Sequence, residues 1–361
     1  MFRERSFVAY RIEAFARLGS YLRQIEEQED YKALLARVEA ENPFFTPASL
    51  RLAIAEWSHL LTEENLSGWI YPYAGSLPRK GGRLALVMAG NLPLVGFHDY
   101  LCGLLCGFSL QIRLSSKDSL LLPFLHQKLQ RLARPESGFA EGGDLTVCFS
   151  KTRMEAFDAI IATGSGNTFR YFDYYFGKYP HILRRNRTSC AVLSGTETEA
   201  ELQSLACDVF AYFGLGCRSV SKLYVPRGYD MAALAGQLAK ASAPLMQTTC
   251  YKNNYDYHKA IYLVNRRPHL DTGSSLLVES EAAASPVSVV YYQTYADKKA
   301  LDATLESMRD SLQCVVGQGY LPFGKAQSPA LNDYADGVNT LDFLCRIGNG
   351  EKDEKSHLEN K

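Results

Sequence analysis

The feature that most constrains this fold is a regular alternation of short apolar strands with helical segments, which starts at residue 83. Residues 83–88 (RLALVM) predict a strand, and residues 93–108 predict the helix that follows it. Alternation at this rhythm predicts a mostly parallel sheet that helices cover on both faces. The pattern continues in predicted strands and helices at residues 110–114, 119–132, 145–149, 158–162 and 164–175.

A second set of strands and helices starts at Ser189 and predicts a second α/β domain. Residues 1–75 precede both sets, and their apolar residues recur at three- and four-residue spacing, which predicts helices. The second set consists of predicted strands at 190–193, 219–225, 287–292 and 312–316 and predicted helices at 197–213 and 231–240.

These patterns predict how the chain divides. We expect a helical segment at residues 1–75 to pack on a first α/β domain at residues 76–188. A second α/β domain is expected at residues 189–345. Residues 346–361 are polar and contain Gly, so we expect a disordered tail.

Charge and hydropathy exclude several classes of protein. Lys plus Arg and Asp plus Glu each number 39, whereas a nucleic-acid-binding protein is usually basic. No apolar run approaches the roughly 20 residues of a membrane span. The start, MFRERSFVAY, lacks the apolar stretch of a secretory signal. We therefore expect a cytoplasmic protein without a membrane span and without a nucleic-acid partner.

The nine cysteines are scattered and form no CxxC pair. An odd number without regular spacing indicates free thiols in a reducing compartment. Cys102 and Cys106 are four residues apart in an apolar helical run, and no His or carboxylate stands at ligand spacing from them. We expect them to pack in the core and expect no metal site.

Asn91 lies in AGNLPL, between a predicted strand and a predicted helix. Its side-chain amide can donate a hydrogen bond to a developing oxyanion. The alternative is that Asn91 only caps the helix, which Asn does well.

Two more segments follow predicted strands. Thr163-Gly164-Ser165-Gly166 has the small residues that let backbone N–H groups approach a phosphate, although it is not GxGxxG. The segment LQIRLSSK ends in cations and hydroxyls that suit a nucleotide ribose or its 2′-phosphate. The alternatives are an ordinary strand–helix turn and a solvated strand end.

Cys217 ends the turn Gly214-Leu215-Gly216-Cys217, at the junction of a predicted helix and a predicted strand. Small neighbours leave room for a substrate, and nearby N–H dipoles favour the thiolate. A thiolate is a good nucleophile for a thioester. The alternative is a buried structural cysteine.

Together and in this order, these segments resemble the aldehyde dehydrogenase superfamily, and most closely its acyl-CoA reductase branch, the LuxC-type fatty-acyl reductases. The resemblance implies two Rossmann-like α/β domains, one for the cofactor and one for catalysis. It covers roughly residues 80–345. It rests on AGNLPLVGFHDYLCGLLCGF, RLSSKDSLLLP, ATGSGNTFRYFDYYFGKYPHILRRNRTS, FGLGCRSVSKLYVP and LPFGKAQSPALNDYADGVNTLDFL.

The resemblance implies roles for particular residues. Cys217 matches the catalytic cysteine, and Asn91 matches the residue that forms the oxyanion hole together with the backbone N–H of that cysteine. The other matches are Arg113 and Ser115 at the adenosine ribose, Gly164 and Ser165 at the pyrophosphate, and Pro322, Phe323 and Gly324 in a turn near the substrate.

The sequence departs from the family at two carboxylates. Leu183 stands near the Glu that activates water in hydrolysing members, which fits a reductase whose acyl-enzyme must not hydrolyse. His181 is either an acid or base or a structural histidine. Glu281 is near the carboxylate that binds the nicotinamide ribose, but its spacing does not match.

The resemblance implies NAD(P)H-dependent reduction of an acyl-CoA or acyl-protein thioester, with a fatty acyl chain. Arg113 and Lys117 favour NADPH over NADH, because a 2′-phosphate attracts a cation. The alternatives are a CoA-acylating aldehyde dehydrogenase working oxidatively, and a non-catalytic acyl- or nucleotide-binding protein. The resemblance is also compatible with a homo-oligomer and with an acyl-protein synthetase as partner. Four residues of the helix after Asn91 either line an acyl tunnel or pack in the core: Phe97, Tyr100, Leu101 and Leu104.

Overall fold

A computed structural model describes residues 2–78, 80–133, 145–150, 154–164 and 166–351 of the chain. The chain divides into two compact units. The first comprises Met1–Arg185 together with Ala330–Lys361, and the second comprises Asn186–Pro329. Within the described ranges, no helix is both long and apolar enough to cross a lipid bilayer.

The described part of the first unit contains a five-stranded parallel sheet with the order β3-β2-β1-β4-β5. Its strands are β1 (Arg83–Val87), β2 (Ser109–Arg113), β3 (Val147–Phe149), β4 (Ala159–Thr163) and β5 (His181–Arg184). Central β1 is buried on both faces, because Leu84 and Leu86 pack on one side and Ala85 packs on the other. A strand of this kind appears in the sequence as a continuous apolar run.

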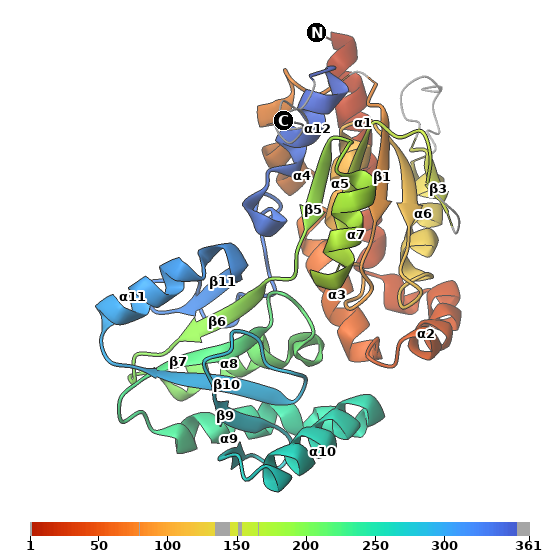
Figure 1. Ribbon diagram of the computed structural model, residues 1–361. Helices are drawn as coiled ribbons and strands as arrows, with labels where there is room; N and C mark the ends of the chain where they lie inside the picture. The colour runs from red at the N-terminus through yellow and green to blue at the C-terminus, as the bar shows by residue number, and fades with distance from the viewer. Residues whose placement is uncertain (1, 79, 134–144, 151–153, 165, 352–361) are drawn as a thin grey trace. The chain divides into compact units, whose positions relative to one another are not determined.

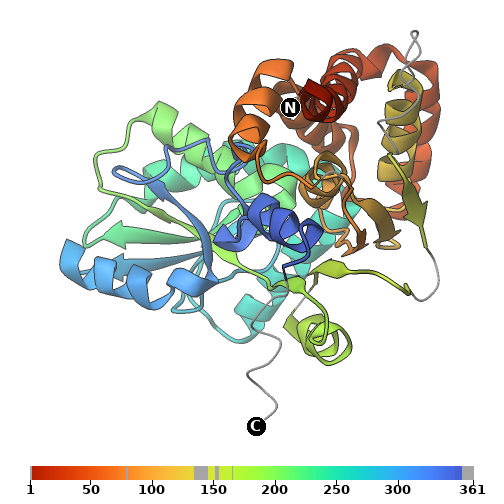
Figure 2. The ribbon, with the colours of Figure 1, turned by 90° about the horizontal axis from the view of Figure 1, so that it is seen from above.

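Helices cover both faces of the first sheet (Figures 1 and 2). The helices are α1 (Phe2–Leu22), α2 (Glu29–Glu41), α3 (Pro47–Leu60), α4 (Glu63–Ile70), α5 (Phe97–Leu105), α6 (Leu121–Leu132) and α7 (Gly166–Phe176). Phe15 of α1 and Tyr100 of α5 share one core with Leu84 and Leu86. Phe172 of α7 packs with Ala85 on the opposite face. The N-terminal helices are therefore part of the first unit.

The C-terminal segment returns to the first unit, where α12 (Thr340–Gly348) contacts α5. We predicted that residues up to 345 belong to the second domain, and that residues from 346 are disordered. The structure instead gives Ala330 onward to the first unit, and α12 continues to Gly348. The physical reason is an apolar helix face, since Leu341, Phe343 and Leu344 are buried in the first core.

The second unit, whose residues are all described, contains a six-stranded sheet with the order β11-β6-β7-β10-β9-β8. All neighbours are parallel except β8 and β9. The strands are β6 (Thr188–Val192), β7 (Val220–Pro226), β8 (Leu270–Asp271), β9 (Leu276–Glu279), β10 (Val289–Tyr295) and β11 (Leu312–Gly317). This is the second α/β domain expected from Ser189 onward, with an additional antiparallel strand at one edge.

Helices also cover both faces of the second sheet. They are α8 (Glu199–Phe210), α9 (Met231–Ser242), α10 (Thr249–Val264) and α11 (Lys298–Ser307). α8 and α9 pack on the face that includes Leu223, and α11 packs on the face of Tyr224. A reciprocal capping box between Thr198 and Glu201 fixes the start of α8.

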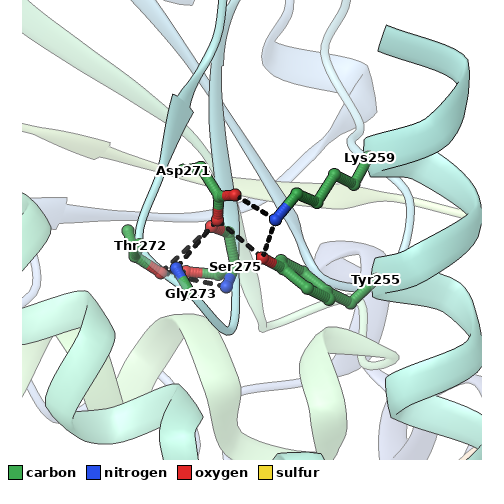
Figure 3. Close-up of polar contacts among 6 residues, drawn as sticks. All are labelled: Tyr255, Lys259, Asp271, Thr272, Gly273 and Ser275. Carbon is green, nitrogen blue, oxygen red and sulfur yellow. Dashed lines mark hydrogen bonds and ion pairs between the residues drawn. The ribbon is translucent and has the colours of Figure 1, made fainter. Parts of the chain in front are cut away.

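A polar cluster attaches α10 to the β8–β9 hairpin (Figure 3). Lys259 Nζ lies 2.7 Å from Asp271 Oδ2, and the Tyr255 hydroxyl donates to Asp271 Oδ1 at 2.7 Å. The N–H of Gly273 also donates to Asp271 at 2.8 Å. Burial opposes ionisation of Asp271, but the hydrogen bonds from Lys259 and Tyr255 outweigh it and lower its pKa. Asp271 is therefore a fixed acceptor that holds the hairpin turn.

Candidate functional site

The carboxyl ends of β1, β2, β4 and β5 form one edge of the first sheet, which we call the carboxyl edge. Ligands of parallel α/β sheets bind outside this edge, because the loops after the strands converge there. Val87, Arg113, Thr163 and Arg184 are the last strand residues. The loops that follow β1, β2 and β4 carry Asn91, Ser115 and Gly164, so the structure places these predicted residues at one edge.

Asn91 is exposed in the loop after β1 and does not cap α5. Gly96 occupies the N-cap position instead, so the simple capping alternative is wrong. Neighbouring contacts fix the loop, since Asn42 Nδ2 donates to the Gly90 carbonyl at 3.2 Å. A side chain at Gly90 would meet Ser115 at 2.6 Å, so only glycine lets the two loops approach this closely.

The predicted ribose-binding residues follow β2. Arg113 and Lys117 are exposed, whereas Ser115 is half-buried and its Oγ accepts the Lys117 N–H at 3.2 Å. Gly164 is half-buried after β4 and precedes α7. Ser165 lies outside the described residues. The cations of Arg113 and Lys117 and the fixed hydroxyl of Ser115 therefore lie at the carboxyl edge, where a nucleotide is expected.

Asp118 is a buried acid in the same loop that sequence reasoning missed. Its Oδ2 accepts the Leu94 N–H at 3.1 Å, while its Oδ1 is buried without a hydrogen-bond partner in the described structure. Burial raises the pKa of Asp118 to about 7, and nearby Glu41 adds to the effect. The hydrogen bond ties the loop after β1 to the loop after β2. Its only sequence signal was an acidic residue four positions after the end of the predicted strand at residues 110–114.

His181 and Leu183 lie on β5, which carries no carboxylate. His181 begins the strand, and so it lies at the end opposite to the carboxyl edge. Its Nδ1 lies 2.8 Å from the Tyr179 carbonyl oxygen. Leu183 packs against the core around Ala85. The structure therefore separates His181 from the other predicted residues of the first unit.

The turn that carries Cys217 precedes β7, at the amino edge of the second sheet, which we define by the starts of β6, β7, β10 and β11. Cys217 is exposed. Tyr212, Phe213 and Gly214, in the 3₁₀ turn Ala211–Gly214, all have positive φ, of 52°, 60° and 75°. Two consecutive non-glycine residues in this region are rare and are maintained only where surrounding contacts hold them.

Buried polar groups surround the Cys217 turn. Ser219 Oγ accepts the Gly216 N–H at 3.2 Å and donates to the Ala211 carbonyl at 3.2 Å. On the other side, the buried Ser189 Oγ donates to the Cys217 carbonyl at 2.8 Å. The turn is therefore restrained both before and at the cysteine.

The predicted Pro-Phe-Gly turn lies beside the Cys217 turn. Arg218 Nη1 donates to the Ala326 carbonyl at 3.3 Å, and Gln327 Nε2 lies 3.4 Å from Ser219 Oγ. Asp208 of α8, which is buried, accepts the N–H groups of Gly324 and Ala326 at 2.6 and 3.0 Å. Burial raises the pKa of Asp208 against these two hydrogen bonds.

Glu281 is exposed in the segment between β9 and β10. The buried Lys222 donates to the carbonyls of Ser280 and Glu281, each at 2.9 Å. Burial lowers the pKa of Lys222, although Cys190 and Glu281 counter this effect. Two residues further, the Ala283 carbonyl accepts from Ser221 of β7 at 3.3 Å. The segment of Glu281 is thus attached to the strand that follows Cys217.

Other predicted residues lie in the core. Cys102 and Cys106 are buried, which confirms their packing role. The four residues considered for an acyl tunnel are also buried in the core of the first unit: Phe97, Tyr100, Leu101 and Leu104. Across the residues that the structure covers, no group of three or more His, Cys, Asp and Glu side chains is arranged to hold a metal ion.

No family model matches the chain, and no curated protein matches it in sequence. Solved structures do match. Aldehyde dehydrogenase 21 from Physcomitrella patens, in complex with the reaction product succinate, has a TM-score of 0.63 at 14% identity, over 94% of this chain and 84% of its own. A mutant of aldehyde dehydrogenase C from Pseudomonas syringae, with NAD+ and octanal, has a TM-score of 0.59 at 10% identity, over 86% and 72%.

An aldehyde dehydrogenase from Mycobacterium tuberculosis, with NAD+, also has a TM-score of 0.59 at 11% identity, over 85% of this chain and 72% of its own. Identities this low carry an argument about architecture alone. The two parallel-sheet units, each covered by helices, are the arrangement that the sequence predicted. The chain therefore has the aldehyde dehydrogenase fold.

Proposed function

We propose that this protein is an NAD(P)H-dependent acyl-CoA reductase with Cys217 as the acyl-accepting nucleophile. The observation that carries the proposal is the Cys217 turn: an exposed thiol at the amino end of β7, held by buried hydroxyls. A cysteine that only packs in a core is buried, as Cys190 and Cys345 are. The acyl-CoA reductase branch is the part of the superfamily that this sequence resembles most.

A nicotinamide cofactor fits the residues of the carboxyl edge. Exposed Arg113 and Lys117 offer positive charge to a ribose 2′-phosphate, which favours NADPH, and Ser115 offers a hydroxyl to the ribose. Gly164 would approach the pyrophosphate, and Glu281 would bind the nicotinamide ribose. When bound, the reduced nicotinamide supplies hydride to the acyl carbon. Two of the matched structures contain NAD+.

In the proposed mechanism, the Cys217 thiolate attacks the thioester carbon, and the amide of Asn91 donates to the oxyanion together with the Cys217 N–H. The CoA thiolate then leaves and Cys217 holds the acyl group. After reduction, the bond to Cys217 breaks and the aldehyde departs.

The absence of a carboxylate on β5 supports reduction over hydrolysis. Leu183 stands near the position where hydrolysing relatives activate water, and it packs in the core. An acyl group on Cys217 would therefore persist until hydride arrives. His181, at the far end of β5, would act as a structural residue.

The test is NAD(P)H consumption with acyl-CoAs of increasing chain length, in the parent and in Cys217→Ala. We expect turnover in the parent and none in the variant. Cys207→Ala is the matched control, because Cys207 is another exposed cysteine of the same unit. If the parent consumes neither NADPH nor NADH at any length, the reductase proposal fails. Aldehyde oxidation with CoA would then favour a CoA-acylating dehydrogenase, and binding alone would favour a non-catalytic protein.

We also propose the compartment, the product class and the partners of this enzyme. A reducing compartment such as the cytoplasm would keep the Cys217 thiol available. The octanal of the Pseudomonas structure supports an aliphatic aldehyde as product here. An acyl-protein synthetase that delivers the acyl group, and a homo-oligomer, are further parts of this proposal.

A further inference from the structure

Ser189 is completely buried at the start of β6, and its hydroxyl links β6 and β11 to the Cys217 turn. Its Oγ donates its single hydrogen to the Cys217 carbonyl at 2.8 Å. Because that hydrogen is used, the two contacts with Cys314 must be accepted: the Cys314 N–H at 3.2 Å and its Sγ at 3.1 Å. The hydroxyl is therefore fully satisfied by β11 and the turn.

The strand pairing is irregular at this point. β6 and β11 lie side by side (Figure 1), and their register shifts between Leu312 and Val315, on either side of Cys314. The register of β6 with β7 shifts between Ser189 and Cys190. In a regular ladder, the Cys314 N–H would donate to a backbone carbonyl, but here it donates to a side chain. Irregularities of this kind re-aim residues next to active sites.

We infer that Ser189 is a positioning residue for Cys217. Its hydrogen bond fixes the carbonyl of the nucleophile itself and so the orientation of the peptide that joins Cys217 to Arg218. Ser219 holds the preceding peptide, because its N–H donates to the Gly216 carbonyl at 3.0 Å. With both peptides fixed, the cysteine sulfur and its N–H present one arrangement to the substrate. This inference rests on the proposed function of Cys217.

The hydrogen bond from Ser189 to the Cys217 carbonyl matters because the backbone before the turn is strained. Tyr212 and Phe213 have positive φ, a conformation that unrestrained residues leave. Without the Ser189 hydroxyl, the Cys217 carbonyl and the Cys314 N–H each lose this hydrogen bond, so the turn gains other conformations. A reaction that depends on near-attack geometry is sensitive to displacements of about 1 Å.

The experiment compares Ser189→Ala with Ser242→Ala. Ser242 is an equally buried serine of the same unit, bonded to Leu238 and Ser274 rather than to the turn. We expect Ser189→Ala to lower kcat at least tenfold per folded enzyme, with the KM for NADPH within twofold of the parent. Amide hydrogen exchange of residues 214–219 should accelerate about tenfold. Ser242→Ala should change neither quantity.

If Cys217→Ala is inactive, either of two results would overturn the inference about Ser189. One is a folded Ser189→Ala enzyme with the kcat of the parent, and the other is a folded Ser189→Ala enzyme whose amide exchange at residues 214–219 equals that of the parent. Ser189→Cys keeps a weaker, longer hydrogen-bonding group and serves if the alanine variant does not fold. It should show an intermediate kcat, and full activity would count against the inference. Activity that survives in Cys217→Ala refutes the proposed function itself, which separates the two failures.

Discussion

The carboxyl edge of the first sheet and the amino edge of the second sheet hold their loops with different chemistry. At the carboxyl edge the groups that hold the loops are buried ionisable side chains: Arg184 pairs with Asp99 at 2.6 Å, and Asp118 accepts the Leu94 N–H. The Gly216 N–H and the Cys217 carbonyl within the Cys217 turn are instead held by two neutral hydroxyls, those of Ser219 and Ser189.

This difference predicts how substitutions at each edge affect the protein. A buried charge is costly unless it is paired, and its contribution to stability depends on pH. Hydroxyls fix a turn without placing a charge beside a thiolate, so they leave the thiol chemistry to backbone dipoles. We expect substitutions at the carboxyl edge to change stability or cofactor binding, and those at the Cys217 turn to change kcat.

The largest expected effect on stability is at Arg184. Its guanidinium also donates to the Ala335 carbonyl and to Thr340, which fastens the C-terminal segment to the first unit. Burial would lower the pKa of Arg184, but Asp99 outweighs it and raises that pKa. Arg184→Leu leaves Asp99 unpaired and should cost about 3–5 kcal/mol of unfolding free energy.

Urea unfolding measures this cost, and Lys259→Met is the control because the Lys259–Asp271 pair is partly exposed. That variant should lose much less stability, because solvent screens an exposed ion pair. Equal losses of unfolding free energy in the two variants would show that the buried Arg184–Asp99 pair stabilises the protein no more than the exposed pair does.

Asn91→Ala should reduce kcat about 10²–10³-fold, or roughly 2.7–4 kcal/mol of transition-state stabilisation. Asn91 is exposed, so the melting temperature should change little. Steady-state kinetics beside a thermal melt separates the two quantities. A kcat within threefold of the parent would remove Asn91 from the proposed oxyanion hole.

Asp118→Asn should stabilise the protein by roughly 1–3 kcal/mol at pH 8 and hardly at all at pH 4. The pKa of Asp118 rises from 3.8 to about 7 on folding. Between these values the folded state binds the extra proton, so the stability of the parent falls as pH rises. Unfolding at both pH values checks this, and an equal gain at both would contradict the burial of a proton on Asp118.

The smallest effect is expected at the exposed cations. Replacing Arg113 and Lys117 together by Ala should raise the KM for NADPH about tenfold, equivalent to roughly 1.4 kcal/mol, and leave the KM for NADH unchanged. Kinetics with both cofactors is the measurement. An equal rise for NADH would place these side chains at a part of the cofactor other than the 2′-phosphate.

Much of the fold was predictable because its strands are buried on both faces. The apolar runs at residues 83–88 and 158–162 correspond to β1 and β4. α10 was not predicted, because TCYKNNYDYHKAIYLV mixes polar and aromatic residues, and Tyr251, Tyr255 and Tyr262 form its buried face only against the hairpin side of the sheet.

The positions of Asn91 and Cys217 in loops at strand ends were predictable, because a glycine precedes each of them. The residues that support these two were not. Ser189, Asp208 and Asp118 act through partners distant in sequence: Ser189 reaches Cys217 and Cys314, and Asp208 reaches Gly324 and Ala326. No local spacing relates such residues to one another.

The sequence by itself determined the alternation of strands and helices, the parallel sheets and the turn that carries Cys217, because apolar periodicity and glycine act over a few residues. Only the tertiary structure decided which buried polar groups pair, and it returned residues from Ala330 to the first unit, where Arg184 binds them. The physical reason is that a buried donor must find an acceptor in space, wherever the chain supplies it.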